Sequence, residues 1–408
     1  MLANYGRQER CALLAVSLGI FCVQLDSFAL NLVLPDIGTS MRATSGLQWT
    51  VSAYLLTVGA LMIPAGNTSD LLGPKTLLTW GLRVFAAGSW LCGTAPTLPL
   101  LVGARVLQGT GAAVITPVGI ALVTRVFPRQ MRGRALGSAL AAGGIATACG
   151  PLVGGVVTSY LSWRAVFWLN VPICLAAAWW CHRSPTTPGS GSEHSRRRRV
   201  WSASGIDPAF RGLLRNSRYV ALTVAGSVAN AATVVFLFVI PLCLRTVWAL
   251  STVATGIAFL APAICMTVAG PLAGRVRASE AAAVMALCVS GAALAFWGVA
   301  SSTACLIAYV VSMSACGGTL GFANALTLVG TQAVVCSERA GVASGMTKTA
   351  VTVSGGLGMV LTGPVAEGAS RGSPLGASQD MLVWTAVSCG VTAVCLSGFL
   401  LWQRRVAA

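Results

Sequence analysis

The chain has 408 residues, of which 55% are hydrophobic and 9% are charged, with a formal net charge of +17 and a mean hydropathy of +0.78. A soluble domain carries about 25% charged residues, so this composition excludes an ordinary water-soluble protein. The only histidines, His182 and His194, lie in one polar segment, and the 14 cysteines include no CxxC pair. We therefore predict neither a metal site nor a cofactor.

Twelve apolar runs of about 20 residues follow one another along the chain. Runs of this length are typical of transmembrane helices, and these lack the alternation of barrel strands. The predicted spans are 11–34, 49–66, 76–95, 99–122, 135–158, 165–181, 219–242, 251–274, 281–300, 303–332, 341–365 and 381–402. The sequence thus predicts an all-α polytopic membrane protein with twelve transmembrane helices in two pseudo-symmetric bundles of six.

The first span contains an aspartate, within "QLDSFALNLVLPDI". Asp26 is the only acidic residue deep inside a span. Ionisable residues in membrane helices are rare and mark ion pathways. Burial disfavours a charge and water favours it, so a cavity that alternates between water and occlusion can load and release a proton at Asp26. The alternative is a structural aspartate, paired permanently with an arginine or a backbone donor.

Other polar groups in the spans are asparagines. Asn31 is predicted to lie on another face than Asp26, because five residues at about 100° each leave them about 140° apart. We expect Asn31 to bond between helices or to a carbonyl near Pro35. Asn170, Asn230 and Asn324 are weaker candidates, since only their position inside spans recommends them.

The segment "GNTSDLLGPK" separates the second and third spans. Glycine supplies the positive φ angles of tight turns. We therefore predict a cytoplasmic turn that includes Gly66, Asp70, Gly73 and Lys75. Asp70 is expected either to cap the following helix, to pair with cytoplasmic arginines, or to be a solvated turn residue.

Basic residues also occur inside three spans. Arg105 lies about six residues into the fourth span, with Gln108 and Gly109 one turn later on a similar face. Such an arginine either faces the bundle interior, where it tunes a nearby carboxylate, or snorkels to the surface. Arg83 is expected to snorkel or to contact lipid. Lys348, about eight residues into the eleventh span, is a candidate for lining a cavity.

The fifth span carries small residues at close spacing. They are Gly137, Gly150, Pro151, Gly154 and Gly155. Small residues let membrane helices approach closely, and proline frees a backbone carbonyl. We expect this patch to pack against another helix.

The longest polar segment, 182–218, is rich in Pro, Gly, Ser and Arg and is typical of a linker. It divides the chain into a six-helix bundle over 1–181 and a second over 219–408. Spans five and eleven open similarly, with "RGRALGSALAAGG" and "RAGVASGMTKT", which suggests two parallel repeats with a transport site between them.

The positive charge is unevenly distributed among the loops. Of 27 Lys and Arg residues, 20 fall in the termini, the linker and the alternate loops on their side, and four in the opposite loops. The positive-inside rule then places both termini and the linker in the cytoplasm. The basic surface is expected to contact anionic membrane lipids. We expect no nucleic-acid binding, because "RRRR" at 196–199 has no interleaved aromatics.

Four of these segments together resemble the major facilitator superfamily, over essentially the whole chain. "LDSFALNLVLP" resembles the first-span motif of its drug/proton antiporter branch, and "GNTSDLLGPK" resembles the superfamily's loop motif. "LVGARVLQGTGAA" resembles the fourth-span motif, and "GSALAAGGIATACGPLVGG" resembles the antiporter motif of span five. Relatives in that branch commonly have fourteen spans, whereas here a polar linker stands in place of the central two.

The resemblance implies a proton-coupled secondary exporter of small amphipathic drugs, antibiotics or toxic metabolites, working by alternating access. It is expected to be a monomer in the inner (plasma) membrane and not an enzyme. From the residues themselves, we assign proton coupling and the substrate cavity to Asp26, Arg105, Gln108 and Lys348, although Lys348 stands where the branch often has Asn. The resemblance implies gating by the 66–75 loop and a hinge or ion seal at the span-five patch. The alternative is a proton-linked importer or metabolite carrier of the same fold.

Overall fold

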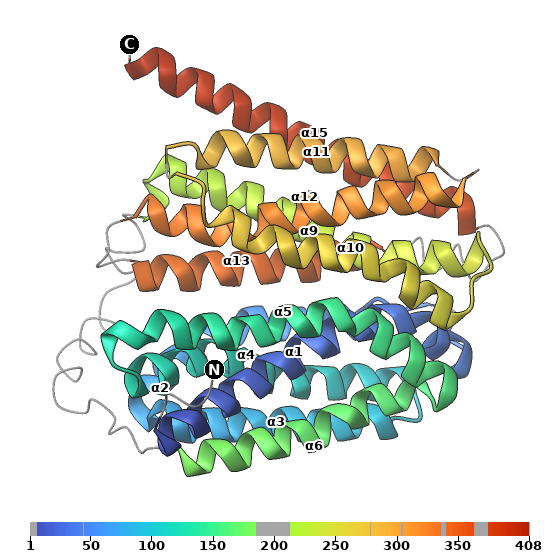
Figure 1. Ribbon diagram of the computed structural model, residues 1–408. Coiled ribbons are helices and arrows are strands. Elements are labelled where there is room, and N and C mark those ends of the chain that lie inside the picture. Colours follow the sequence, from blue (N-terminus) through green and yellow to red (C-terminus); the bar gives the residue numbers. More distant parts are fainter. Residues whose placement is uncertain are drawn as a thin grey trace. The chain divides into compact units, whose positions relative to one another are not determined.

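The structure is a computed structural model. It describes residues 6–43, 45–184, 213–277, 279–302, 305–335, 340–362 and 374–407. All regular elements in these ranges are helices (Figure 1). They are α1 (Arg7–Ser40), α2 (Trp49–Leu72), α3 (Pro74–Thr94), α4 (Leu98–Val126), α5 (Arg129–Tyr160), α6 (Trp163–Arg183), α9 (Ser217–Thr246), α10 (Thr252–Ala273), α11 (Ala281–Ser301), α12 (Leu306–Ala333), α13 (Ala340–Val360) and α15 (Pro374–Ala407).

Ten of these helices are long and apolar enough to cross a membrane, judged on the described residues alone. The other two, α3 and α13, have 21 residues each. At about 1.5 Å per residue, each of them is as long as a bilayer core of about 30 Å is thick. Lys75 and Arg83 lower the hydropathy of α3, and Lys348 with several Ser, Thr and Gly residues lowers that of α13. The predicted all-α, twelve-helix membrane fold is confirmed.

The chain divides into two compact units, residues 1–43 with 53–205, and residues 44–52 with 206–408. The first contains α1, most of α2, and α3 to α6, and the second contains α9 to α15. Most of the predicted linker 182–218 lies outside the described residues, so its role and bounds stay a prediction.

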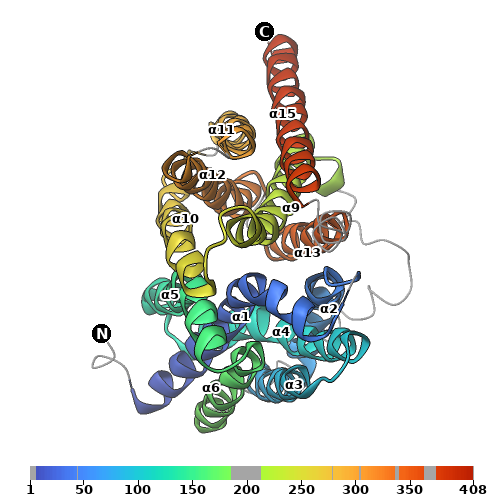
Figure 2. The ribbon, with the colours of Figure 1, turned by 90° about the vertical axis from the view of Figure 1, so that its right-hand side faces the viewer.

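In the first unit, α1 packs against α4, α5 and α6, and α3 packs against α4 and α6 (Figure 2). The core between these helices is built from apolar side chains such as Leu82, Phe85 and Leu122, which are fully buried. This arrangement surrounds the middle of α1 with protein, so a polar side chain there has to find its partners on the neighbouring helices.

In the second unit, α9 is enclosed by its neighbours, with 78% of its most apolar stretch buried. It packs against α10, α11, α12, α13 and α15. Phe236 on α9 contacts Phe259 of α10 and Phe296 of α11, with ring centroids 5.5 and 6.3 Å apart. This aromatic cluster fills the interior of the second unit.

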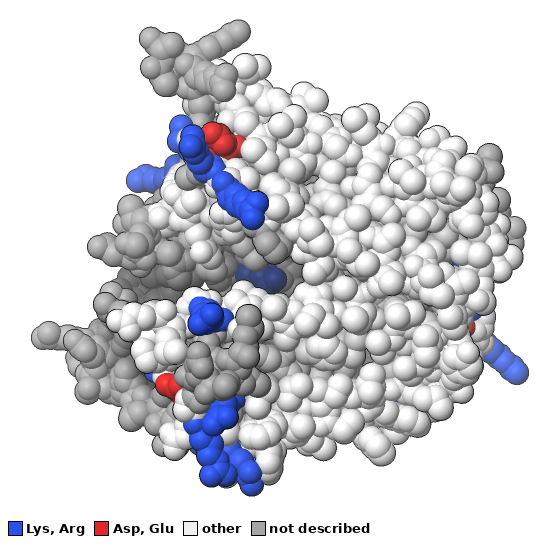
Figure 3. Space-filling model, viewed as in Figure 1, with Lys and Arg blue, Asp and Glu red and all other residues white. Residues whose placement is uncertain are grey.

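On the face shown in Figure 3, the Lys and Arg side chains gather mainly at one end of the helices, and the sides of the helices carry almost no charge. Uncharged sides of this kind suit contact with lipid, while charged ends suit contact with water and headgroups.

Candidate functional site

A buried ion pair joins the first and fourth helices. Arg105 Nη1 on α4 donates to Asp26 Oδ2 on α1 at 2.6 Å, and both side chains are only 1% exposed. Arg105 therefore points into the unit and does not snorkel to its surface. Buried charges in membrane proteins are found in such pairs, because an isolated one is very unfavourable.

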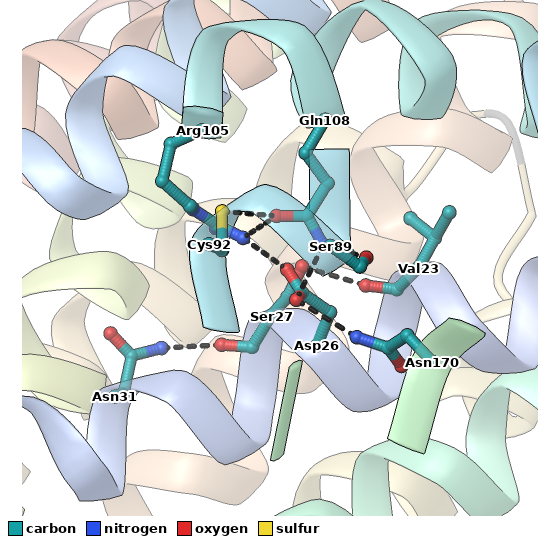
Figure 4. Close-up of polar contacts among 9 residues, drawn as sticks. All are labelled: Val23, Asp26, Ser27, Asn31, Ser89, Cys92, Arg105, Gln108 and Asn170. Atoms are coloured by element: carbon teal, nitrogen blue, oxygen red, sulfur yellow. Dashed lines mark hydrogen bonds and ion pairs between the residues drawn. The ribbon is translucent and has the colours of Figure 1, made fainter. Parts of the chain in front are cut away.

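Three more polar side chains complete what we call the Asp26 cluster, which consists of Asp26, Arg105, Gln108, Asn170 and Ser89 (Figure 4). Gln108 Oε1 accepts from Arg105 Nη1 at 2.5 Å, and its Nε2 donates to Asp26 Oδ1 at 2.9 Å and to Ser89 Oγ at 2.7 Å. Asn170 Nδ2 on α6 donates to Asp26 Oδ1 at 3.1 Å. The carboxylate thus receives three hydrogen bonds, one of them from a charged donor.

Aromatic rings close the cluster around the guanidinium. Arg105 Cζ lies 4.1 Å from the centre of the Tyr54 ring and 5.8 Å from that of Phe167. Tyr54 is 2% exposed and Phe167 is fully buried. The ring faces attract the cation, and the rings separate the ion pair from lipid and water.

Glycines set how closely the surrounding helices approach. A Cβ on Gly88 of α3 would lie 2.6 Å from the backbone of Gln108, and one on Gly109 of α4 would lie 2.9 Å from the carbonyl oxygen of Tyr54. Only glycine fits at such distances, so these positions let α4 lie directly against α3 and α2. The close approach places Gln108 beside Ser89 and the Tyr54 ring over Arg105.

The structure therefore brings together three of the residues predicted for proton coupling, Asp26, Arg105 and Gln108. The fourth, Lys348, lies half-buried on α13 of the second unit, so its part in the cavity stays a prediction.

The sequence ranked Asn170 only as a weak candidate, yet it contacts the carboxylate directly; its one signal is a polar residue in the apolar run "WRAVFWLNVP". The sequence analysis missed Ser89 of the cluster and the neighbouring Tyr54, because serine and tyrosine are ordinary residues in spans. Asn31 lies away from the carboxylate, as predicted, but it donates to the Ser27 carbonyl of its own helix at 2.6 Å and not to another helix (Figure 4).

The predicted turn at 66–75 is shorter than expected. Gly66 and Asp70 belong to α2, which continues to Leu72, so the prediction of a turn at Gly66 is wrong. The turn is at Gly73, which has a φ of 83°. Lys75 Nζ donates to the carbonyl of Ser184 at the end of α6, at 2.6 Å. Its positive charge suits the negative end of that helix and links α3 to α6.

The small-residue patch of α5 lies against α1. A Cβ on Gly150 would lie 2.7 Å from Phe28 Cβ, and one on Gly154 would lie 2.9 Å from the carbonyl oxygen of Ala29. Pro151 and Gly155 are buried beside them. Gly137 differs, since no described atom outside its own stretch of helix lies within 4 Å of its Cβ position. Part of the patch is therefore a close helix–helix contact, and Gly137 is not part of that contact.

The chain resembles known proteins along most of its length. The family model of the Major Facilitator Superfamily matches residues 16–359. Among curated proteins, the riboflavin transporter RibZ of Clostridioides difficile is 33% identical over 172 residues, which is 42% of this chain and 38% of that protein.

Two further relatives are named for resistance. The multidrug resistance protein Stp of Mycobacterium tuberculosis is 36% identical over 41% of this chain and 32% of its own length. The methylenomycin A resistance protein of Streptomyces coelicolor is 36% identical over 39% of this chain and 34% of its own length. The matched part of the chain thus spans between 32% and 38% of the length of each of these curated relatives.

Solved structures share the fold at low sequence identity. A bacterial homologue of the human lysosomal transporter Spinster superposes with a TM-score of 0.77 and 16% identity, over 98% of both chains. A D-xylose–proton symporter superposes with a TM-score of 0.71 and 14% identity, over 93% of this chain and 96% of its own. At these identities the likeness concerns the fold.

Proposed function

Because the chain belongs to the Major Facilitator Superfamily, we propose that it is a proton-coupled exporter of small amphipathic compounds. This superfamily consists of membrane transporters and not of enzymes. The compounds in question are drugs, antibiotics or toxic metabolites. The observation that carries the proposal is the buried Asp26 carboxylate paired with Arg105.

Proton binding at Asp26 changes the balance of charge inside the protein. With Asp26 ionised, the pair is neutral and its hydrogen bonds are satisfied. With Asp26 protonated, the Arg105 guanidinium is left without its counter-charge, which is unfavourable away from water. The protonated state therefore favours a conformation in which the cluster opens to water, and the ionised state favours the closed cluster. This link between protonation and opening is what proton-driven alternating access requires.

The remaining roles belong to the same proposal. Lys348 contributes to the substrate cavity together with Asp26, Arg105 and Gln108. The segment with Gly66, Asp70, Gly73 and Lys75 acts in gating on the cytoplasmic side, and the α5 patch of Gly137, Gly150, Pro151, Gly154 and Gly155 acts as a hinge or ion seal.

Placement in the membrane completes the proposal. The proposal has the basic ends of the helices facing the cytoplasm and anionic lipids and, by the positive-inside rule, both termini on that side of the plasma membrane. The protein is proposed to act as a monomer.

The relatives favour export but also support a second candidate. Two of them are named for drug resistance, which fits removal of toxic compounds. The riboflavin transporter RibZ is similar over a comparable stretch, and it supports a proton-linked importer or metabolite carrier as the alternative.

Direction of transport separates the two candidates. Inside-out membrane vesicles with an acidic lumen should accumulate a fluorescent amphipathic dye if the protein exports in exchange for protons. Accumulation should stop when the pH gradient is collapsed and in vesicles with Asp26→Asn. The importer would be favoured if right-side-out vesicles with an acidic exterior take up the dye and inside-out vesicles do not accumulate it.

A further inference from the structure

The carboxylate of Asp26 is contacted by hydrogen-bond donors. Arg105 Nη1 donates to Oδ2, and Gln108 Nε2 and Asn170 Nδ2 both donate to Oδ1. This set suits an anion, which only accepts hydrogen bonds. A protonated carboxyl group also has an O–H to donate, and none of these three contacting atoms can accept it.

Arg105 and Gln108 cannot change to meet that need. Arginine has no acceptor. Gln108 is fixed in its present orientation, because its Oε1 accepts from Arg105 and from the Cys92 thiol while its Nε2 donates to Asp26 and Ser89. If its amide turned over, an N–H would face the N–H of Arg105.

Asn170 is held differently. Its Nδ2 makes the bond to Asp26, while its Oδ1 is buried and has no hydrogen-bond partner among the described residues. The side chain is fully buried, and Figure 4 shows its oxygen turned away from the carboxylate. Buried amide oxygens are rarely left unpaired. The two ends of a carboxamide are nearly the same size, so the amide can turn over without a change in packing.

We propose that Asn170 is the proton-sensing partner of Asp26: when Asp26 is protonated, the Asn170 amide turns over and its Oδ1 accepts the new O–H. This inference rests on the proposed function, since it needs Asp26 to take up a proton. The proton binds at Oδ1, because Oδ2 faces the Arg105 cation. One O–H bond forms on Asp26, no other covalent bond changes, and release of the proton reverses the turn.

The other titratable groups near Asp26 do not offer an equivalent partner. Tyr54 of α2, Cys92 of α3 and Cys22 of α1 interact with this region electrostatically, and these side chains are neutral near pH 7 in their ordinary chemistry. Cys22 and Cys174 of α6 are neighbouring free thiols. Arg105 supplies the positive charge. The residues that α5 presents to this stretch of α1, Gly143, Thr147 and Gly150, do not titrate.

Infrared difference spectroscopy can test the turn directly. The full-length protein is reconstituted in lipid vesicles with asparagine labelled by ¹³C at the side-chain carbonyl, and spectra at acidic and alkaline pH are subtracted. We expect a protonated-carboxyl band on acidification that is lost in Asp26→Asn. At the same pH midpoint, one labelled amide carbonyl band should move to lower frequency, because it becomes a hydrogen-bond acceptor.

Two variants sharpen the test. In Asn170→Leu, which keeps about the same volume, the labelled amide shift should disappear and the carboxyl band should move to higher frequency, because its O–H loses the acceptor. Asn31→Leu is the matched control, since Asn31 is a buried amide of the same unit that donates to the Ser27 carbonyl of its own helix and makes no hydrogen bond to Asp26 among the described residues. It should leave both bands as in the wild type.

The outcomes distinguish this inference from the proposed function. A carboxyl band in the wild type with no change in any asparagine band would overturn the role of Asn170 and leave proton uptake at Asp26 intact. An unchanged carboxyl band in Asn170→Leu would do the same. If the wild type shows no carboxyl band that disappears in Asp26→Asn, proton uptake at Asp26 is overturned, and the role of Asn170 with it. The wild-type measurement decides even if Asn170→Leu does not fold.

Discussion

The contact between α1 and α5 allows a graded test of packing with an internal control. In Gly154→Ala the new Cβ would lie 2.9 Å from the carbonyl oxygen of Ala29 and 3.1 Å from its Cα, both backbone atoms that cannot rotate away. Overpacking of this kind costs about 1–3 kcal/mol. Replacing glycine by alanine in a helix also stabilises it by about 1 kcal/mol. Gly137→Ala gains the second effect without the first, because no described atom outside its own stretch of helix lies within 4 Å of its Cβ position.

The difference between the two variants therefore isolates the contact with α1. Domains of 150–250 residues shift by about 2–4 °C for each kcal/mol, so Gly154→Ala should unfold about 2–12 °C below Gly137→Ala in detergent. Gly154→Leu should still insert into the membrane but should fail to transport, since a branched side chain cannot fit beside Ala29. Equal unfolding temperatures for the two alanine variants, or normal transport by Gly154→Leu, would show that Gly154 does not face α1.

Three further predictions concern the ion pair and the linker. Asp26→Asn should abolish transport driven by a pH gradient, measured per folded molecule in proteoliposomes, and wild-type rates there would move the proton site to another acid such as Asp36 or Glu367. Removing one member of a buried pair costs about 3–5 kcal/mol, so Asp26→Asn should also lower the amount of folded protein. Adding Arg105→Gln should restore that amount but not proton coupling. Size-exclusion profiles would measure the amount of folded protein in both variants. A reporter that is active in the cytoplasm should be active when fused after Ser192, and a reporter that is active in the periplasm should not. Deletions within 186–195 should leave folding unchanged, and loss of folding would count against a linker.

The helices were predictable because apolar length is a physical requirement for crossing a bilayer. The pairing of Asp26 with Arg105 was accessible for a related reason, since a charge inside a span needs a partner and the first unit has few candidates. The contacts of Asn170 were not accessible, because a lone asparagine in an apolar run can bond to its own helix, as Asn31 does, or to another, as Asn170 does. Which of these occurs depends on how the helices pack, and spacing along one helix does not determine it.

The 66–75 segment shows the limit of turn signals. Gly66 was expected to begin a turn, but glycine only permits a turn and does not impose one. The helix continues until Gly73 and Pro74, where a positive φ and the steric demand of proline on the preceding residue end it. The pair Gly73 and Pro74, and not Gly66, therefore determines where α2 ends.

The Asp26 cluster and the small-residue patch of α5 both contact α1. Asp26 on α1 is held by Arg105 and Gln108 of α4 and by Asn170 of α6. Two and three residues further along the same helix, Phe28 and Ala29 lie directly against the glycines of α5. A proton on Asp26 removes the charge attraction to Arg105 and so weakens the attachment of α1 to α4, whereas the bond to Asn170 of α6 is kept when that amide turns over. The small residues Gly150 and Gly154 let α5 lie in close contact with α1. In the proposed mechanism α1 is therefore the element through which protonation is converted into movement, and for this reason Gly154→Leu and Asp26→Asn should both stop transport although they act on different faces of the helix.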